Sequence, residues 1–496
     1  MADSHYLAFD LGASSGRAVL GSFDGQRLKL EEVHRFPNGP VRVLDHIHWD
    51  VVGLFEQIRK GLAAGAARVK GLDGIGIDTW GVDFGLLSRD GQLLGLPYHY
   101  RDRRTQGMME AAFARVPREQ IYAQTGIQFM PLNTLYQLLS VAANDPALLD
   151  AADTLLFMPD LLNYWLTGVR QSEFSIASTS QLYDSAGNAW AGPLFDKLGL
   201  PLRIMPRVVP PGTAIGGLLP DIAEGTGLKP VQVIAPACHD TAAAVAAVPA
   251  SGEGWAYISS GTWSLVGVEL PSPIRTPEAL AANFTNEGGV AGTIRFLKNV
   301  AGLWLVQECQ RTWEAQGRPI SHDELAKMAE AAPPHVCFVD PDDPRFAEPG
   351  DMPQRIREYC LATGQPVPQT QGEVVRCALD SLALKYRAVV HQIERLTGRG
   401  IEVLHVVGGG VRNELLCRLT ADATGKLVIA GPAEATAAGN VMVQAMARGR
   451  VSSLADIRQV IARSTALRRY EPTSRQEWAD ASARFEALLH QERGHH

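Results

Sequence analysis

Residues 6–25, YLAFDLGASSGRAVLGSFDG, join two strand-like apolar runs through a turn of small residues. A similar arrangement returns at residues 255–270, WAYISSGTWSLVGVEL. Both stretches predict a strand, a turn and a second strand, because short apolar runs around a Gly/Ser turn are typical of β-hairpins. The repeat is faint, but it predicts a chain of two halves that each open on a β-hairpin.

The bulk composition agrees with two domains and limits the possible partners. A chain of 496 residues is longer than one hydrophobic core usually organises. Its 46 basic and 53 acidic residues leave a net charge of −7 without a basic run, so nothing indicates nucleic acid or a membrane as a partner. The amino terminus, MADSHYLAFDLG, has no signal-peptide pattern, and no apolar stretch approaches the roughly 18 residues of a membrane helix. We therefore expect a cytoplasmic protein.

The cysteines do not follow a familiar metal or redox motif. They lie at positions 238, 309, 337, 360, 377 and 417. The lack of CxxC pairs and of His-rich zinc spacing argues against a structural metal or thioredoxin-like chemistry, and we expect mostly reduced thiols. Cys360 and Cys377 lie in helix-like segments that could meet in space, but their spacing does not establish a disulfide.

Helical and strand-like segments alternate along the chain. In the first half, residues 51–69 predict a helix and residues 75–95 predict a pair of strands with a tight Arg-Asp-Gly turn. In the second half, residues 374–398 predict a helix that stops at a glycine, and residues 401–410, IEVLHVVGGG, predict a strand that enters a glycine turn. Residues 412–425 predict another helix with a glycine stop. Strand, glycine turn and helix start is an arrangement that lets the backbone approach a nucleotide.

Two segments are expected at the surface. Residues 333–353, PPHVCFVDPDDPRFAEPGDMP, are rich in proline and acidic residues and predict a loop, which either shapes access to a site or has no specific role. The last five residues, ERGHH, are expected to form a frayed tail.

The first hairpin turn has the composition of a phosphate-binding loop. Gly12–Arg17, GASSGR, would allow backbone N–H groups and hydroxyls to surround phosphate oxygens, although ordinary Gly/Ser hairpin loops look the same. Asp10 ends the preceding strand, where a carboxylate needs a partner, so it is a candidate for organising Mg²⁺. Residues 259–262, SSGT, repeat this chemistry, with Thr262 offering a hydroxyl. The chain has no GxxxxGK[ST] loop, which excludes a P-loop, and no GxGxxG after its first strand, which weakens a dinucleotide site.

A single carboxylate stands out in residues 234–245, IAPACHDTAAAV. Asp240 precedes a helix-like run, so it could simply accept N–H groups of the first helical turn. A carboxylate at a helix start can also accept the proton of a substrate hydroxyl during phosphoryl transfer. The residue types alone leave both interpretations open, and the two do not exclude each other.

Eight short motifs, taken in order, resemble the FGGY family of carbohydrate kinases. They are FDLGASSGR, GIDTWGVDF, YRDRRT, HDTAAAV, SSGTWSL, NEGG, LKNVAGLWLVQ and VVGGGVRNELL. The resemblance covers nearly the whole chain. It implies a duplicated α/β fold, the actin-like or ribonuclease H-like ATPase fold, with two domains around a central cleft. The domains are expected at residues 1–244 and 245–496, with the second binding the nucleotide.

The resemblance also implies residue roles. ATP is expected to contact Ala13, Ser14, Ser15, Gly16, Arg17, Thr262, Gln307 and Gly409. The sugar is expected to contact Gly81, His239, Asp240, Thr241 and Asn299. Asp240 is expected to be the catalytic base, and Asp10 is expected near the Mg²⁺ that accompanies ATP.

The motifs LGASSGR and DTWGVDF most closely resemble the branch of the family that acts on L-rhamnulose. The implied reaction moves the γ-phosphate of MgATP to the sugar's 1-hydroxyl, giving L-rhamnulose 1-phosphate and ADP in L-rhamnose catabolism. L-Fuculose, L-xylulose and L-ribulose stay open as substrates. An actin-like ATPase that binds a polypeptide would need no base for a sugar hydroxyl. A sugar-responsive repressor would carry amino-terminal DNA-binding helices and a Cys-rich zinc loop, which the sequence lacks.

Three further residues have two interpretations each. Trp80 either stacks on the sugar or belongs to the core, where strand tryptophans more often lie. Asp78 and Asp83 flank the Trp-Gly pair, and each either bonds to sugar hydroxyls or ends a strand.

Overall fold

The computed structural model describes residues 3–473 and 475–493, so the last three residues of the expected tail lie outside the described residues. The chain forms two compact units. Unit 1 comprises Met1–Ser251, Glu269–Phe296 and Ala435–Thr465, and unit 2 comprises Gly252–Val268, Leu297–Glu434 and Ala466–His496. Each unit gathers segments that are distant in sequence, and the domain boundary expected after residue 244 stays a prediction.

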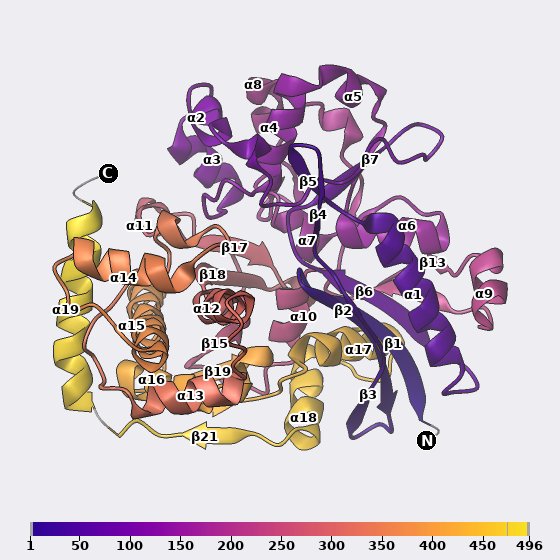
Figure 1. The fold of residues 1–496 in the computed structure, drawn as a ribbon. Helices are drawn as coiled ribbons and strands as arrows, with labels where there is room; N and C mark the ends of the chain where they lie inside the picture. Colours follow the sequence, from indigo (N-terminus) through magenta and orange to yellow (C-terminus); the bar gives the residue numbers. More distant parts are fainter. Residues whose placement is uncertain (1–2, 474, 494–496) are drawn as a thin grey trace. The chain divides into compact units, whose positions relative to one another are not determined.

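The central sheet of unit 1 has the strand order β13-β14-β6-β1-β2-β3 (Figure 1). Its strands are β1 (Ser4–Leu11), β2 (Ser15–Phe23), β3 (Leu28–Pro37), β6 (Gly74–Thr79), β13 (Thr213–Gly217) and β14 (Gln232–Ala235). Strands β1 and β2 form the first predicted hairpin, and β6 runs parallel to β1 on its other side.

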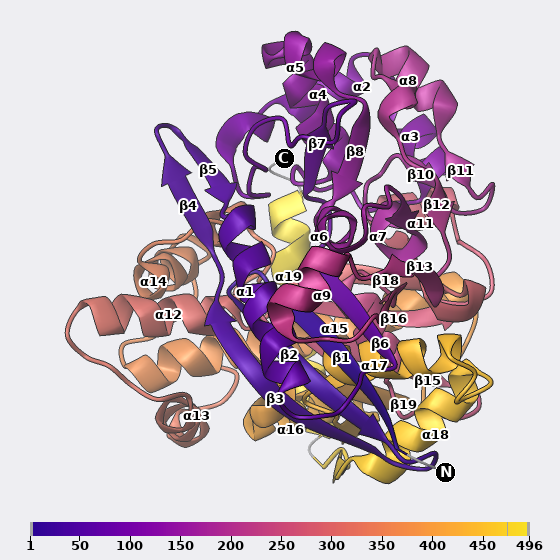
Figure 2. The same ribbon diagram turned by 90° about the vertical axis from the view of Figure 1, so that its right-hand side faces the viewer.

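The two faces of β1 meet different helices because successive side chains of a strand point to opposite sides. Leu7 and Phe9 belong to one buried cluster with Ile58 and Leu62 of α1 (Val51–Ala66), which covers one face of the sheet (Figure 2). The other face is packed against α17 (Ala435–Ala447). The burial of α1 follows from its apolar stripe, so this predicted helix is confirmed.

The second sheet has the strand order β17-β18-β16-β15-β19-β20-β21. Its strands are β15 (Trp255–Ser260), β16 (Trp263–Leu270), β17 (Thr285–Gly288), β18 (Ile294–Ala301), β19 (Val403–Val407), β20 (Leu427–Ala430) and β21 (Arg468–Tyr470). Strands β15 and β16 are antiparallel neighbours and form the second predicted hairpin.

The two sheets repeat one topology. In each, the hairpin's first strand has a parallel neighbour, β6 beside β1 and β19 beside β15. The next strand outward is again parallel, β14 or β20, and the edge strand beyond it is antiparallel, β13 or β21. Each of β14 and β20 is followed along the chain by an alanine-rich helix, α10 (Asp240–Ala246) or α17. The faint duplication read from the hairpins therefore extends through five strands.

Shorter elements complete both units. Unit 1 also holds α2 (Met108–Phe113), α3 (Arg118–Thr125), α4 (Thr134–Asn144), α5 (Pro146–Ala151), α6 (Met158–Thr167), α7 (Phe174–Ser178), α8 (Gly192–Leu198), α9 (Pro220–Thr226), α11 (Pro277–Ala281) and α18 (Leu454–Ser464). Unit 2 holds α12 (Trp304–Ala315), α13 (His322–Ala331), α14 (Met352–Ala362), α15 (Gln371–Thr397), α16 (Glu414–Thr424) and α19 (Arg475–Arg493). Small ribbons are formed by β4 (Pro40–Val43), β5 (His46–Trp49), β7 (Phe84–Leu87), β8 (Thr154–Phe157), β9 (Ser172–Glu173), β10 (Tyr183–Asp184), β11 (Ala189–Trp190) and β12 (Val208–Val209). No helix among the described residues is both long enough and apolar enough to cross a membrane.

The two glycine stops are confirmed. Helix α15 ends at Gly398 and α16 ends at Gly425, and both glycines adopt the left-handed conformation that favours glycine after a helix. Helix α15 starts with a capping box between Thr370 and Glu373, which fixes its first turn. The strand β19 then enters the glycine turn at Gly408, as predicted.

Two predictions about local structure are wrong in part. The predicted Arg-Asp-Gly turn is present, closed by a hydrogen bond from the Ser88 N–H to the Gln92 carbonyl at 2.8 Å. Residues 75–95 also contain two strands, but β6 belongs to the central sheet and β7 pairs with β8 instead. The chain changes direction between β6 and β7 at Val82, whose φ is 69°. The segment 333–353 is not a simple surface loop, because Phe338 and Phe346 are buried and the Nζ of Lys385 lies 2.7 Å from Asp340.

Candidate active site

Three carboxylates lie near one another in unit 1. Asp10 and Asp78 lie near the ends of the central strands β1 and β6, and Asp240 lies at the start of α10. Asp10 of β1 and Asp78 of β6 are partners in the parallel register. Asp78 is fully buried, and burial first, then the charges of Asp10 and Asp240, raise its pKa well above the ordinary value, against a bond from Asn440. Asp78 Oδ1 has no hydrogen-bond partner among the described residues. Asp10, Asp78 and Asp240 offer oxygen ligands of the kind that Mg²⁺ takes, and a bound cation would favour their charged forms.

Asp10 is held by the other strand of its hairpin. The register places Arg17 opposite Asp10, and Nη2 and Nε of Arg17 lie 2.6 and 3.0 Å from Asp10 Oδ2. The turn between them is closed by a bond from Gly12 N–H to the Ser15 carbonyl, at 2.9 Å. Asn38 braces it by donating its side-chain amide to the Gly12 carbonyl, at 2.7 Å. The hairpin therefore fixes an arginine and a carboxylate beside one small-residue turn.

The predicted phosphate residues of this turn differ in exposure. Ser14 is exposed, Ala13 and Ser15 are half-buried, and Gly16 is buried. A Cβ at position 16 would lie 2.3 Å from the ring of Phe36, so close packing requires glycine there. The turn thus presents Ser14 and Ser15 outward on a rigid base.

Asp240 occupies the first position of α10, after the N-cap residue His239. Its Oδ1 accepts hydrogen bonds from the backbone N–H and the hydroxyl of Thr241. Its Oδ2 accepts no hydrogen bond from any residue that the structure describes. The side chain keeps 31 % of its surface exposed, against 12 % for Asp10. One oxygen is therefore committed to the helix start and the other is available.

His239 is locked beside Asp240 by a buried network. Arg295 Nη2 lies 3.0 Å from His239 Nδ1, and a guanidinium can only donate, so Nδ1 accepts and the hydrogen is assigned to Nε2. This Nε2 lies 3.5 Å from Asp240 Oδ1. Glu287 pairs with Arg295 at 3.1 Å, and although burial opposes it, the charge of Arg295 lowers the pKa of Glu287. The imidazole is fixed in both orientation and tautomer.

The predicted sugar residues of unit 1 lie together. Thr79 at the end of β6 forms a parallel bridge with His239, which brings the following turn beside α10. A Cβ added to Gly81 would lie 3.4 Å from His239 Nε2. Gly81, His239, Asp240 and Thr241 therefore share one corner, and their contacts with a sugar stay a prediction.

Asp83 and Trp80 turn out to be structural. Asp83 Oδ2 accepts the indole N–H groups of Trp49 and Trp80 at 2.6 and 2.9 Å, and Oδ1 accepts the Gln137 amide at 2.8 Å. Burial raises the pKa of Asp83 to about 6, although these hydrogen bonds oppose the shift. Trp80 is 6 % exposed and belongs to the buried cluster of unit 1, so the core interpretation is confirmed.

Unit 2 assembles the other predicted nucleotide residues around its hairpin turn. Thr262 donates its hydroxyl to Gln307 Oε1 at 3.0 Å, and its carbonyl accepts the Gly302 N–H at 3.0 Å. Gly409 is exposed, and a Cβ there would meet nothing within 4 Å. Asn299 is half-buried on β18, also in unit 2. A nucleotide site made of these residues stays a prediction.

The glycine turn of unit 2 has strict packing requirements on either side of Gly409. Gly408 has a φ of 85°, and a Cβ at Gly410 would lie 2.0 Å from Ser260 Oγ. The turn therefore rests directly on the end of β15.

Helix α17 supports the carboxylate group and was missed in the sequence analysis. Asn440 donates to Asp78 Oδ2 at 2.6 Å, and Gln444 donates to Asn440 Oδ1 at 2.7 Å. At the residue just before Asn440, a Cβ at Gly439 would lie 1.8 Å from the carbonyl oxygen of Ala243 in α10. The alanines after Asp240 thus serve a close helix contact. The signal in the sequence was the matching run of small residues at 435–439.

Comparisons with known proteins show that both halves of the chain match domains of one protein family. Residues 5–247 match the N-terminal domain of the FGGY family of carbohydrate kinases, and residues 256–448 match its C-terminal domain. Proteins named rhamnulokinase are similar over nearly their full lengths. The protein from Bacteroides thetaiotaomicron is 49 % identical over 481 residues, 97 % of this chain and 98 % of that protein. The protein from Pectobacterium atrosepticum is 45 % identical over 98 % of this chain and 97 % of its own length.

Solved structures share the fold at low sequence identity. A ligand-bound xylulose kinase from Lactobacillus acidophilus matches with a TM-score of 0.81 at 15 % identity, over 99 % of this chain and 98 % of that chain. Glycerol kinase from Plasmodium falciparum, solved with ADP, matches with a TM-score of 0.79 at 14 % identity and the same coverage. The predicted two-domain α/β fold of the actin-like ATPase type is confirmed.

Proposed function

Because the chain belongs to the FGGY family of carbohydrate kinases, we propose that it transfers the γ-phosphate of MgATP to the 1-hydroxyl of L-rhamnulose. The products are L-rhamnulose 1-phosphate and ADP. Support for this sugar comes from relatives named rhamnulokinase that are 41 to 49 % identical over at least 94 % of the chain. Support for the chemistry comes from the environment of Asp240.

The observation that carries the mechanism is the free oxygen of Asp240. Phosphoryl transfer to a hydroxyl needs an acceptor for the departing proton. Asp78 is buried and Asp10 is held by Arg17, whereas Asp240 is the most exposed of the three carboxylates. Its Oδ2 makes no hydrogen bond within the described part of the chain. We therefore assign the proton of the 1-hydroxyl to Asp240 Oδ2.

His239 and Thr241 hold the base in position. Thr241 fixes Oδ1 from the backbone and from its hydroxyl, so Oδ2 has a defined direction. His239 presents an Nε2 hydrogen on the same side, where it can donate to a sugar oxygen while Arg295 holds the ring. Preorganised donors and acceptors of this kind supply much of the acceleration in phosphoryl transfer, because the transition state asks little covalent chemistry of the protein.

The donor set of unit 1 fits a magnesium ion that accompanies ATP. Mg²⁺ is bound through one or two carboxylates plus phosphate oxygens, and Asp78 Oδ1 is a buried carboxylate oxygen without a partner. Asp10 and Asp78 would hold the ion, directly or through water. When bound, Mg²⁺ supplies charge neutralisation at the phosphates.

The two hairpin turns are assigned to the nucleotide. Ser14, Ser15 and Arg17 carry the hydroxyls, N–H groups and positive charge that phosphates require. In unit 2, Thr262 and Gln307 form one hydrogen-bonded pair next to the glycine turn. The exposed Gly409 lets a flat ring approach the backbone there.

The test is ADP release with MgATP and a panel of sugars: L-rhamnulose, L-fuculose, L-xylulose, L-ribulose and glycerol. We expect the highest kcat/KM with L-rhamnulose. A higher value for another ketose would move the protein to another branch of the family with the same base. ATP hydrolysis that no sugar stimulates would contradict the proposed sugar-kinase activity.

A further inference from the structure

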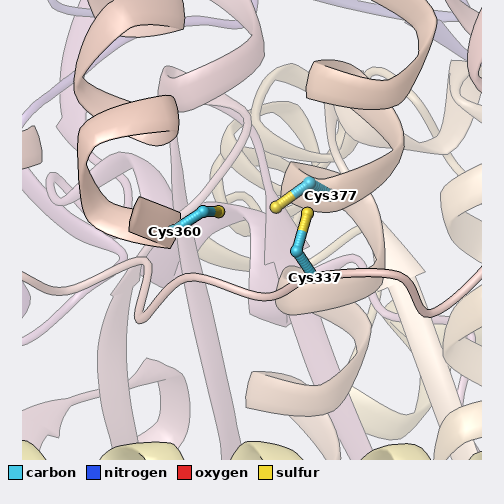
Figure 3. Close-up of side chains that lie close together, drawn as sticks. All are labelled: Cys337, Cys360 and Cys377. Carbon is cyan, nitrogen blue, oxygen red and sulfur yellow. The ribbon is translucent and has the colours of Figure 1, made fainter. Parts of the chain in front are cut away.

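Three cysteines that are distant in sequence meet inside unit 2 (Figure 3). Cys337 lies in the extended segment after α13, Cys360 lies in α14, and Cys377 lies in α15. Their Sγ atoms are all within 4.8 Å of one another, and all three residues are buried free thiols. The spacing of the cysteines in the sequence does not reveal this cluster, because only tertiary packing brings the three segments together.

We propose that Cys337, Cys360 and Cys377 form a three-coordinate thiolate site for a soft d10 cation of the copper(I) class. Sulfur ligands bind such cations at about 2.3 Å, so three sulfurs around one ion would stand about 4 Å apart. The three Sγ atoms all lie within 4.8 Å of one another, which is close to this separation.

The number of ligands favours copper(I) over zinc. Structural zinc sites are closed by four protein ligands in a tetrahedron. Within the described residues, the group consists of three cysteines and includes no histidine or carboxylate as a fourth ligand. Soft thiolates without oxygen or imidazole ligands select copper(I) among the common ions.

The surroundings provide access and a stable frame. A cavity of about 210 Å³ is lined by Cys337 and Cys377, which gives an ion a path to the sulfurs. Arg376 is paired with Asp380 at 2.8 Å on the same stretch of α15. Arg484 donates to the backbone carbonyl just before Cys337, at 3.0 Å, and so places positive charge near the thiolates.

A bound ion would link the segment that carries Cys337 to α14 and α15. The segment that carries Cys337 is also held to α15 by Lys385, whose Nζ lies 2.7 Å from Asp340, and by backbone N–H groups that donate to Asp380 Oδ2 at 2.8 Å and Ser381 Oγ at 2.9 Å. The next residue of α15, Tyr386, contacts the hydroxyl of Ser264 on β16 at 2.7 Å. A ligand that binds only the folded state raises its stability, so a loaded site is expected to raise the Tm.

The experiment is a copper(I) titration of the reduced, full-length protein without oxygen, in competition with bathocuproine disulfonate. We expect one tightly held equivalent and an X-ray absorption spectrum with three sulfur ligands. Removing a residue that only hydrogen-bonds to a metal ligand weakens metal binding about 10- to 100-fold. Cys337→Ala removes a ligand itself, so it should weaken copper(I) binding by more than about 100-fold. Cys417→Ala, a buried cysteine outside the cluster, should bind like the wild type.

A second variant, Cys360→Ala, should lose the same equivalent, and thermal unfolding without metal checks that each variant is folded. Binding that is unchanged in Cys337→Ala would overturn the proposal, as would a spectrum with two sulfur ligands. A reduced wild-type protein in which all six thiols are counted as free but which holds no tight equivalent would overturn it as well.

Discussion

At the scale of single residues, Asp78 has the most unusual environment of the unit 1 carboxylates. It is fully buried, its Oδ2 accepts from Asn440, and its Oδ1 has no partner among the described residues. Such a group is destabilising by itself, because a buried carboxylate loses its hydration. We interpret it as a position kept for a cation, since Asn440 is its hydrogen-bond donor and, within the described part of the chain, no basic side chain forms an ion pair with it.

Asp78→Asn tests this interpretation. The amide oxygen still accepts from Asn440, and burial already favours the neutral form of Asp78 by raising its pKa, so the free energy of unfolding should stay about equal. The Mg²⁺ concentration that gives half-maximal turnover should rise by at least about tenfold. Steady-state kinetics over a Mg²⁺ series measures this, with the exposed Asp90→Asn as the control. An unchanged Mg²⁺ requirement together with lower stability would make Asp78 a core residue only.

Asp83 predicts a pH dependence of stability. Its pKa in the folded state is raised to about 6, so the folded protein binds the proton more tightly than the unfolded chain does. The free energy of unfolding must therefore fall as the pH rises from about 4 to about 6, by roughly 3 kcal/mol in total from this group. Between pH 5 and 7.5 the remaining part is on the order of 1 kcal/mol.

Urea unfolding of the wild type and Asp83→Asn at several pH values checks this. The stability advantage of the wild type over the variant should shrink as the pH rises, because only the wild type ionises at this position. The exposed Asp221→Asn should keep a constant difference from the wild type. An advantage that grows with pH would mean that Asp83 is stabilised as the anion.

At the scale of elements, the position of the base depends on the contact between α10 and α17. Asp240 begins α10, and the next residues are alanines that lie against Gly439. The helix is only 7 residues long, so this contact fixes its direction more than its own hydrogen bonds do.

Gly439→Ala should disturb this contact. A methyl group 1.8 Å from the Ala243 carbonyl forces the helices apart, which should lower the free energy of unfolding by about 1 to 3 kcal/mol. Because Asp240 moves with α10, kcat should fall as well. Thermal unfolding and turnover measure both effects, and Gly71→Ala, whose Cβ meets nothing within 4 Å, is the matched control. Equal behaviour of the two variants would contradict the role given to the contact.

The elements that the sequence predicts well are those with local signals. The helices α15 and α16 are marked by apolar periodicity and glycine stops, and both hairpins are marked by small-residue turns. Neither Asn440 nor the three clustered cysteines had such a signal. Asn440 reaches Asp78 across 362 positions of sequence, so only the packing of α17 on the sheet brings the two together.

At the scale of the whole molecule, the repeated hairpin was the visible part of a longer duplication. The parallel strands β6 and β19 each follow their hairpin only after long insertions, which hide the repeat from a sequence pattern. The segment 333–353 was predicted as an exposed loop because proline and acidic residues dominate it. It is buried in part because Lys385, on a distant helix, neutralises Asp340 and Asp342.

The duplication also accounts for the distribution of the candidate site. Each sheet offers a small-residue turn at its first hairpin, and each has an alanine-rich helix after its third parallel strand. The helix after β14 starts with Asp240, whereas the helix after β20 is α17, which also belongs to unit 1 and carries Asn440. One copy of the repeat thus carries the proposed base, and the other contributes the residue that holds Asp78.

The most direct test of the proposed chemistry is the turnover of Asp240→Asn with L-rhamnulose and MgATP. We expect kcat to fall by about 10²- to 10⁴-fold while ATP binding and the Tm stay close to wild type, because the amide keeps the contacts of Oδ1 but accepts no proton. The exposed Asp221→Asn serves as the control. Turnover near the wild-type rate in Asp240→Asn would contradict the assignment of Asp240 as the base.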